Sequence, residues 1–152
     1  MYEIQQYKDV YSHEPHHYAG KTKDLSWDDV KRFILFRFPD TEKKIKYEFL
    51  LFNPRWFQCL KSWQYSTAKK IDVVVESPAG NFLIETDPYL RDETLGQLLT
   101  YKYWYERQEQ KTCKIIAVCK EVQEMTANLL LISGAEIYRI TETEIKQYTK
   151  II

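Results

Sequence analysis

The chain has 152 residues, with 22 Lys and Arg residues balanced by 22 Asp and Glu residues. This length suits one domain with a sizeable core. The zero net charge excludes a generally basic surface for holding a polyanion, so any nucleic-acid surface must be local. Three cysteines without a CxxC spacing disfavour a disulfide framework and a zinc site. We find no signal peptide and no apolar run of about 18 residues, so we expect an intracellular, cytoplasmic protein without a membrane segment.

The first expected element follows an N-terminal arm, residues 1–25, which shows no sustained period. Ser26 precedes Asp28 and Asp29 in a capping-box-like pattern, and apolar residues at helical spacing predict a first helix that ends near Pro39. Either aspartate could also supply a carboxylate to a site. Residues 43–52 alternate and predict a strand. Residues 55–68 are ambiguous in secondary structure. The basic and aromatic stretch that contains Arg55, Trp56, Lys61, Trp63, Lys69 and Lys70 could stack on bases and contact phosphates, with a core position as the alternative for the two tryptophans.

A β-hairpin is the clearest signal in the next segment, where two strands, residues 69–77 and 82–87, flank a turn. Asp92 is expected to cap a helix that runs to about residue 108. A strand at 113–119, a helix at 121–132 and a strand at 136–140 follow. Thr141 and Glu144 resemble a capping box and predict a C-terminal helix over 141–152. This order predicts one α/β domain, with a mixed central sheet flanked by helices and a core over residues 26–140.

Acidic residues of the predicted hairpin form the candidate site. Successive strand side chains point to opposite faces, so Lys70 and Asp72 share one face of the first strand, and Glu85 and Asp87 share one face of the second. Asp72 and Glu85 can therefore converge. Neighbouring carboxylates favour a cation that neutralises them, and oxygen ligands suit Mg²⁺ or Mn²⁺. We predict that Asp72, Glu85 and Asp87 lie within about 6 Å of one another around such a metal ion.

Two residues of the following helix complete this site. Gln97 and Tyr101 stand four positions apart, so both can face the same strand ends. Ordinary roles are the alternative: Asp72 and Glu85 as a solvated strand pair, and Gln97 and Tyr101 as part of an amphipathic helix.

These motifs resemble those of the PD-(D/E)XK nuclease superfamily. Ile71-Asp72, Ile84-Glu85-Thr86-Asp87 and the segment from Gln97 to Tyr101 are similar to its Asp, (Asp/Glu)-x-Lys and QxxxY motifs. The RecB-like branch, which includes archaeal mismatch-specific endonucleases of the EndoMS type, is the most similar. The resemblance implies an αβββαβ restriction-endonuclease-like core. It also implies metal coordination by Asp72 and Glu85, an orienting role for Gln97, and packing or phosphate contact by Tyr101.

The lysine of the family motif is replaced here by Asp87. Lys70 is the expected substitute, because its predicted strand face is that of Asp72. Lys102 has the poorer geometry, since it points about 100° around the helix from Tyr101.

The resemblance implies a Mg²⁺- or Mn²⁺-dependent nuclease that hydrolyses DNA, or acts on RNA, and that forms a homodimer to cut two strands. The alternative is a catalytically inactive nuclease-fold protein that binds nucleic acid or serves in an assembly. The replaced lysine and the zero net charge favour this alternative. A pure protein-interaction domain would explain the aromatic content, but not the ordered series of Asp, Glu and Gln.

Overall fold

The structure, a computed structural model, describes residues 25–40, 42–52 and 69–150. The interpretations of the N-terminal arm up to residue 24 and of residues 55–68 lie outside these ranges. In chain order the elements are α2 (Trp27–Arg37), β1 (Lys44–Leu51), β2 (Lys69–Ser77), β3 (Gly80–Leu90), α3 (Asp92–Glu109), β4 (Lys114–Val122), α4 (Glu124–Ile132), β5 (Glu136–Ile140) and β6 (Ile145–Tyr148).

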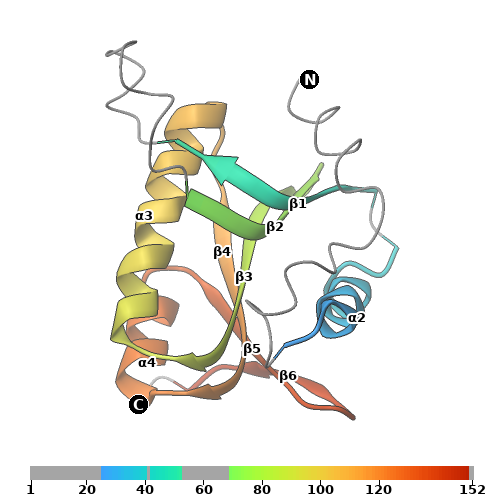
Figure 1. The fold of residues 1–152 in the computed structure, drawn as a ribbon, viewed down its shortest axis with the longest axis vertical. Helices are drawn as coiled ribbons and strands as arrows, with labels where there is room; N and C mark the ends of the chain where they lie inside the picture. The colour runs from blue at the N-terminus through green and yellow to red at the C-terminus, as the bar shows by residue number, and fades with distance from the viewer. Residues whose placement is uncertain (1–24, 41, 53–68, 151–152) are drawn as a thin grey trace.

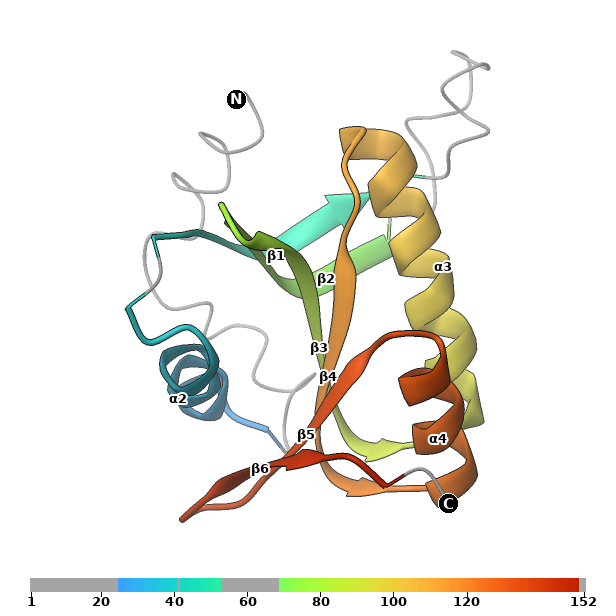
Figure 2. The same ribbon diagram turned by 180° about the vertical axis from the view of Figure 1, so that it is seen from behind.

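All six strands belong to one sheet, in the order β1-β2-β3-β4-β5-β6. The pairs β3–β4 and β4–β5 are parallel and the other three are antiparallel. Helices α3 and α4 connect the parallel strands and cover one face of the sheet, and α2 covers the other (Figures 1 and 2). The predicted mixed α/β sheet is therefore confirmed, and the order α2-β1-β2-β3-α3-β4 is the expected αβββαβ. None of the described helices is long and apolar enough to cross a membrane.

Helix α2 begins at the predicted capping box. The Ser26 hydroxyl accepts the Asp29 N–H at 3.1 Å, and the Asp29 carboxylate accepts the Ser26 N–H at 3.3 Å. The same carboxylate pairs with Arg32, one turn further along the helix. Asp29 therefore has a structural role here, and Val30 and Phe33 bury the inner face of the helix against the sheet.

The alternation of strand side chains divides the core into two layers. Val73 belongs to the cluster beneath α2, and its neighbour Val74 belongs to the cluster beneath α3 and α4. Helix α3 contributes a stripe of buried residues at helical spacing to the second layer. This stripe consists of Thr94, Leu98, Tyr101 and Tyr105.

The predicted C-terminal helix over 141–152 is wrong, because residues 145–148 form the edge strand β6. The Thr141 hydroxyl accepts the N–H groups of Thr143 and Glu144, and the Thr141 N–H donates to the Glu144 carbonyl oxygen. The same local pattern that starts a helix here closes a turn between two antiparallel strands.

The predicted cap at Asp92 is also wrong, although the helix itself is confirmed. Arg91 is the N-cap residue of α3, and its side chain makes no capping hydrogen bond. The Asp92 carboxylate instead accepts the Thr126 hydroxyl at 2.8 Å, which joins the start of α3 to α4. Helix α4 begins at Glu124, three residues later than predicted, because β4 continues to Val122.

A carboxylate on β5 connects α2 to the sheet. The Arg37 guanidinium donates from Nε and Nη2 to the two Glu136 carboxylate oxygens, each at 2.9 Å. The Tyr138 hydroxyl donates to the same carboxylate at 2.6 Å. Burial alone would raise the pKa of Glu136, but these hydrogen bonds and the positive charges of Arg37 and Lys114 lower it to about 2.

Glu76 on β2 is a buried carboxylate, and it connects α3 to the sheet. It accepts the Tyr105 hydroxyl at 2.7 Å and pairs with Lys46 at 3.1 Å. Burial opposes ionisation of Glu76, yet these partners and Lys111 lower its pKa below the ordinary value. Burial and the Glu76 carboxylate raise the pKa of Tyr105. The pair therefore consists of a charged carboxylate and a neutral phenol at neutral pH.

Candidate functional site

The site lies where β2 and β3 stop pairing through their backbones. Their ladder runs from Ser77 opposite Gly80 to Val73 opposite Ile84, and the next row holds Asp72 and Glu85. In that row the Asp72 N–H donates to the Glu85 carboxylate at 2.9 Å. A side chain thus takes the place of a backbone acceptor, which brings the two predicted acidic residues together.

Thr86 holds the other carboxylate of the pair. Its N–H and its hydroxyl both donate to Asp72 Oδ2, at 2.9 and 2.8 Å. The carboxylates of Asp72 and Glu85 are therefore both oriented by donors from the neighbouring strand. Asp72 is 2% exposed and Glu85 is 7% exposed. Buried carboxylates of this kind require charge compensation or strong hydrogen bonds.

A third acidic residue continues this row onto β1. The β1–β2 register pairs Tyr47 with Val73 and Phe49 with Ile71, so Glu48 stands opposite Asp72. Glu48 has a φ of 54°, which is unusual for a residue with a side chain, and it is 2% exposed. We call Glu48, Asp72 and Glu85 the acidic row, because they occupy one row across three neighbouring strands.

Tyr101 on helix α3 responds to the charges of Asp72 and Glu85. Burial raises the pKa of Tyr101, the negative charges of Glu85 and Asp72 raise it further, and hydrogen bonding to Gln97 opposes the shift. Tyr101 is buried on the inner face of α3, and it lines one surface pocket together with Gln97. The structure therefore brings Asp72 and Glu85 together and places Gln97 and Tyr101 together on α3, where Tyr101 responds to both carboxylates. Their roles at a site stay a prediction.

Asp87 serves a different contact. Its Oδ2 accepts the Thr94 hydroxyl at 2.6 Å, and its Oδ1 accepts the Tyr89 N–H at 3.1 Å. Both oxygens are thus engaged at the junction where β3 leads into α3. Within the described ranges, no group of three or more His, Cys, Asp and Glu side chains is placed to hold a metal ion. The predicted group of three carboxylates that includes Asp87 is therefore not formed among these residues.

Lysines near the site differ in what they contact. Lys69 lines a surface pocket of about 400 Å³ together with Glu93, Gly96, Gln97, Thr100 and Tyr101. Lys70, the predicted substitute for the motif lysine, is not among the lining residues. Lys102 is engaged elsewhere, because its ammonium donates to Glu106 at 2.6 Å and to the Cys113 carbonyl oxygen at 2.7 Å.

The alternation of side chains along β2 is irregular at Asp72, and this affects the prediction for Lys70. Ile71 and Val74 belong to the same core cluster beneath α3, although strict alternation would place residues three apart on opposite faces. The side chains of β2 therefore change their alternation between Ile71 and Val74. This change lies in the row where Glu48 of β1 has its positive φ. The prediction assumed that Lys70 and Asp72 share a face because they are two residues apart on a regular strand, and β2 is not regular there.

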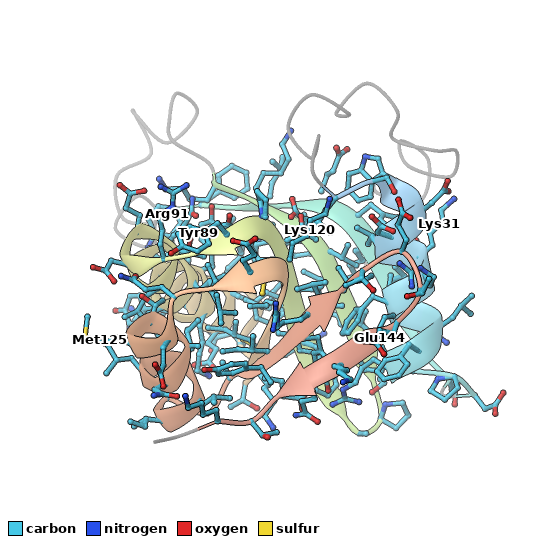
Figure 3. All side chains as sticks on the ribbon, turned by 90° about the horizontal axis from the view of Figure 1, so that it is seen from below. Lys31, Tyr89, Arg91, Lys120, Met125 and Glu144 are labelled. Carbon is cyan, nitrogen blue, oxygen red and sulfur yellow. The ribbon has the colours of Figure 1, made fainter. Side chains whose placement is uncertain are left out.

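Glu48 and Arg91 are near the site and were missed by the sequence reasoning. Glu48 had a signal, since it interrupts the apolar neighbours Tyr47 and Phe49. Lys69 was predicted only as one member of the basic and aromatic stretch that could contact phosphates, because the fold alone distinguishes it from Lys70. Arg91 lies with its guanidinium carbon 5.5 Å from the centre of the Tyr89 ring, and Figure 3 shows these two side chains next to each other. This pair adds a cation and an aromatic surface where β3 ends and α3 begins.

The donor set fits a hard divalent cation. Mg²⁺ is commonly bound by one or two carboxylates, with water and substrate phosphate oxygens completing its shell. Asp72 and Glu85 supply two oriented carboxylates from adjacent strands. No cysteine or histidine is involved among the described residues of the row, so the chemistry of the ligands favours Mg²⁺ or Mn²⁺ over a softer metal.

Comparison with known proteins gives a likeness in fold. The sequence matches no protein-family model and no curated protein. The crystal structure of a repair endonuclease from Pyrococcus abyssi is similar, with a TM-score of 0.52 and 15% identity, over 76% of this chain and 46% of that one. The structure of an EndoMS complex with double-stranded DNA gives a TM-score of 0.46 and 16% identity, over 75% of this chain and 44% of that one. The chain spans less than half the length of either, and its mixed α/β fold is of the kind found in the repair endonuclease.

Proposed function

We propose that this protein is a divalent-metal-dependent nuclease that hydrolyses DNA phosphodiester bonds. The observation that carries the proposal is the meeting of Asp72 and Glu85 beneath Tyr101 and Gln97. These are the four residues, in the same strand, strand and helix order, that resemble the PD-(D/E)XK motifs. The fold likeness to a repair endonuclease supports DNA as the substrate.

Asp72 and Glu85 would hold Mg²⁺ or Mn²⁺, which supplies an activated water and shares the negative charge that develops on the phosphate. The chain contributes orientation. Thr86 fixes the Asp72 carboxylate with two hydrogen bonds, and the Asp72 N–H fixes Glu85. Tyr101 remains a neutral phenol, since burial and the two carboxylates raise its pKa. It can therefore donate a hydrogen bond to a phosphate oxygen without adding negative charge to the site.

A second candidate function is binding of nucleic acid without cleavage. It is favoured by one specific observation, the replacement of the motif lysine by Asp87, whose carboxylate is bonded to Thr94 and to the Tyr89 N–H. A nuclease of this kind needs a cation near the phosphate, and Asp87 supplies none. The two functions share the same surface, so cleavage is the property that separates them.

The test combines cleavage with metal binding. We expect the parent protein to nick supercoiled plasmid DNA with Mn²⁺ or Mg²⁺, and millimolar Mn²⁺ to raise its melting temperature, because the metal binds only the folded state. Asp72→Asn should abolish both effects. Glu142→Gln, which changes an exposed carboxylate far along the chain, serves as the matched control and should preserve both.

Three outcomes separate the candidates. An unchanged melting temperature of the parent with Mn²⁺ would contradict the metal site. Metal binding and DNA binding without nicking would support the inactive relative. Cleavage of an RNA of the same sequence in preference to the DNA would retain the nuclease and change its substrate.

A further inference from the structure

Lys69 lies on the strand face that α3 covers. Its partner across the β1–β2 ladder is Leu51, and Ile71 follows it two residues later. Both belong to the core cluster beneath α3 and α4. Cross-strand partners and residues two apart share a face of a sheet, so Lys69 projects toward α3. This assignment agrees with the pocket, which Lys69 lines together with Gln97 and Tyr101.

The Lys69 ammonium is available for a ligand. None of the ion pairs formed among the described residues involves Lys69, whereas Lys46, Lys102, Lys111 and Lys114 are each paired with a carboxylate. Lys69 is also exposed, so binding a phosphate oxygen requires no prior desolvation of a buried charge.

The pocket offers a further donor for one phosphate group. The Gln97 amide joins the Lys69 ammonium at its lining, whereas the Thr100 hydroxyl donates its proton to the Gly96 carbonyl oxygen. Glu93 adds a negative charge to the same lining. This charge weakens attraction for free phosphate, so the pocket suits a phosphate that the rest of a nucleic acid holds in place.

The pocket adjoins the acidic row through Tyr101. This residue lines the pocket and is influenced by the charges of Glu85 and Asp72, and Asp72 follows Lys69 by three residues on β2. We propose that Lys69 supplies the phosphate-contacting cation that Asp87 does not, by binding the nucleic-acid phosphate next to the Asp72–Glu85 pair. The assignment rests on the proposed nuclease function. The flexible stem of a lysine allows its ammonium to reach several Å into such a pocket.

The experiment compares Lys69→Ala with Lys70→Ala and with Lys146→Ala, an exposed lysine on β6 that serves as the control. The first readout is single-turnover cleavage of a labelled DNA duplex with Mn²⁺. Removal of a preorganised donor to the reacting phosphate lowers rates by about 10²-fold, which we expect for Lys69→Ala. Lys69→Arg should recover part of the rate, Lys70→Ala should lose less than tenfold, and Lys146→Ala should cleave like the parent.

The second readout does not depend on cleavage. Affinity for the duplex is measured without metal at several salt concentrations. Loss of one phosphate contact lowers the slope of log K against log salt by about 1, which we expect for Lys69→Ala and not for Lys146→Ala. Melting temperatures show whether each variant is folded, and Lys69→Gln, which keeps a long polar side chain, replaces Lys69→Ala if that variant unfolds.

The outcomes separate this inference from the proposed function. A parent that cleaves while Lys69→Ala cleaves equally fast would overturn the role of Lys69 and leave the nuclease intact. A larger loss from Lys70→Ala than from Lys69→Ala would overturn it as well. A parent that cleaves nothing, with a reduced salt slope in Lys69→Ala, would retain the phosphate contact and remove the catalysis. Unchanged salt slopes together with absent cleavage would remove both.

Discussion

The Arg37–Glu136 pair should make stability depend on pH in a defined window. The pKa of Glu136 is about 2 in the folded protein against an ordinary value of 4.5. A depressed carboxylate pKa stabilises the folded state above the unfolded pKa, and this contribution is lost as the pH falls from about 4.5 toward 2. The side chains of Arg37 and Glu136 are only 26% and 13% exposed, so solvent screens the interaction little.

The magnitude follows from the shift. One pH unit corresponds to about 1.4 kcal/mol, so the difference between 4.5 and about 2 is worth about 3 kcal/mol at pH 7. Linkage reduces this contribution to about half by pH 3. Replacing the carboxylate by the neutral amide in Glu136→Gln should therefore lower the free energy of unfolding by about 3 kcal/mol at pH 7, and by about half as much at pH 3.

Urea unfolding followed by tryptophan fluorescence at pH 7, 5, 4 and 3 measures this difference. Glu142→Gln, at an exposed position, is the control and should change the free energy of unfolding by less than about 0.5 kcal/mol at each pH. If Glu136→Gln costs the same at pH 3 as at pH 7, the loss arises from packing and the electrostatic reasoning is refuted.

Two further predictions concern the Tyr105 hydroxyl and the thiols of Cys113 and Cys119. Tyr105→Phe removes the hydroxyl that donates to charged Glu76, and should lower the free energy of unfolding by about 1.5–3 kcal/mol. Tyr103→Phe, at an exposed position, is the control and should change the free energy of unfolding little; thermal unfolding measures both variants. Burial raises the pKa of Cys113 and of Cys119 to about 12, so iodoacetamide at pH 8 should modify both slowly in the folded protein and rapidly in urea, as peptide mass spectrometry would show; rapid modification of the folded protein would contradict the assignment.

Local patterns predicted the elements whose hydrogen bonds are local. The Ser26–Asp29 capping box and the hairpin around residues 78–81 are formed within a few residues, and both are confirmed. Thr141 and Glu144 show the limit of such patterns. A hydroxyl that accepts an N–H two or three residues later can begin a helix or close a turn. Pairing with β5 decides between them here, and that pairing is not encoded in the motif itself.

The candidate site was predictable to the extent that it depends on the hairpin. Asp72 and Glu85 meet because one antiparallel register sets both positions. The choice between Lys69 and Lys70 depends on the irregular row at Glu48, which lies on another strand and shifts the alternation. The contacts of Asp87 depend on the path of the chain from β3 into α3, where the Thr94 hydroxyl donates to the Asp87 carboxylate. Contacts of this kind arise from tertiary structure and have no counterpart in strand periodicity.

The hydrogen bond from the Asp72 amide to Glu85 makes hydrogen exchange at this amide sensitive to the state of the Glu85 carboxylate. A backbone amide that donates to a carbonyl oxygen of the neighbouring strand is protected as long as the two strands stay together. The Asp72 amide instead depends on a carboxylate that can rotate. If Mg²⁺ draws Glu85 toward itself, this amide loses its acceptor while the rest of the ladder is unchanged. Deuterium exchange at one backbone position would then follow occupancy of the site directly, without any nucleic acid present.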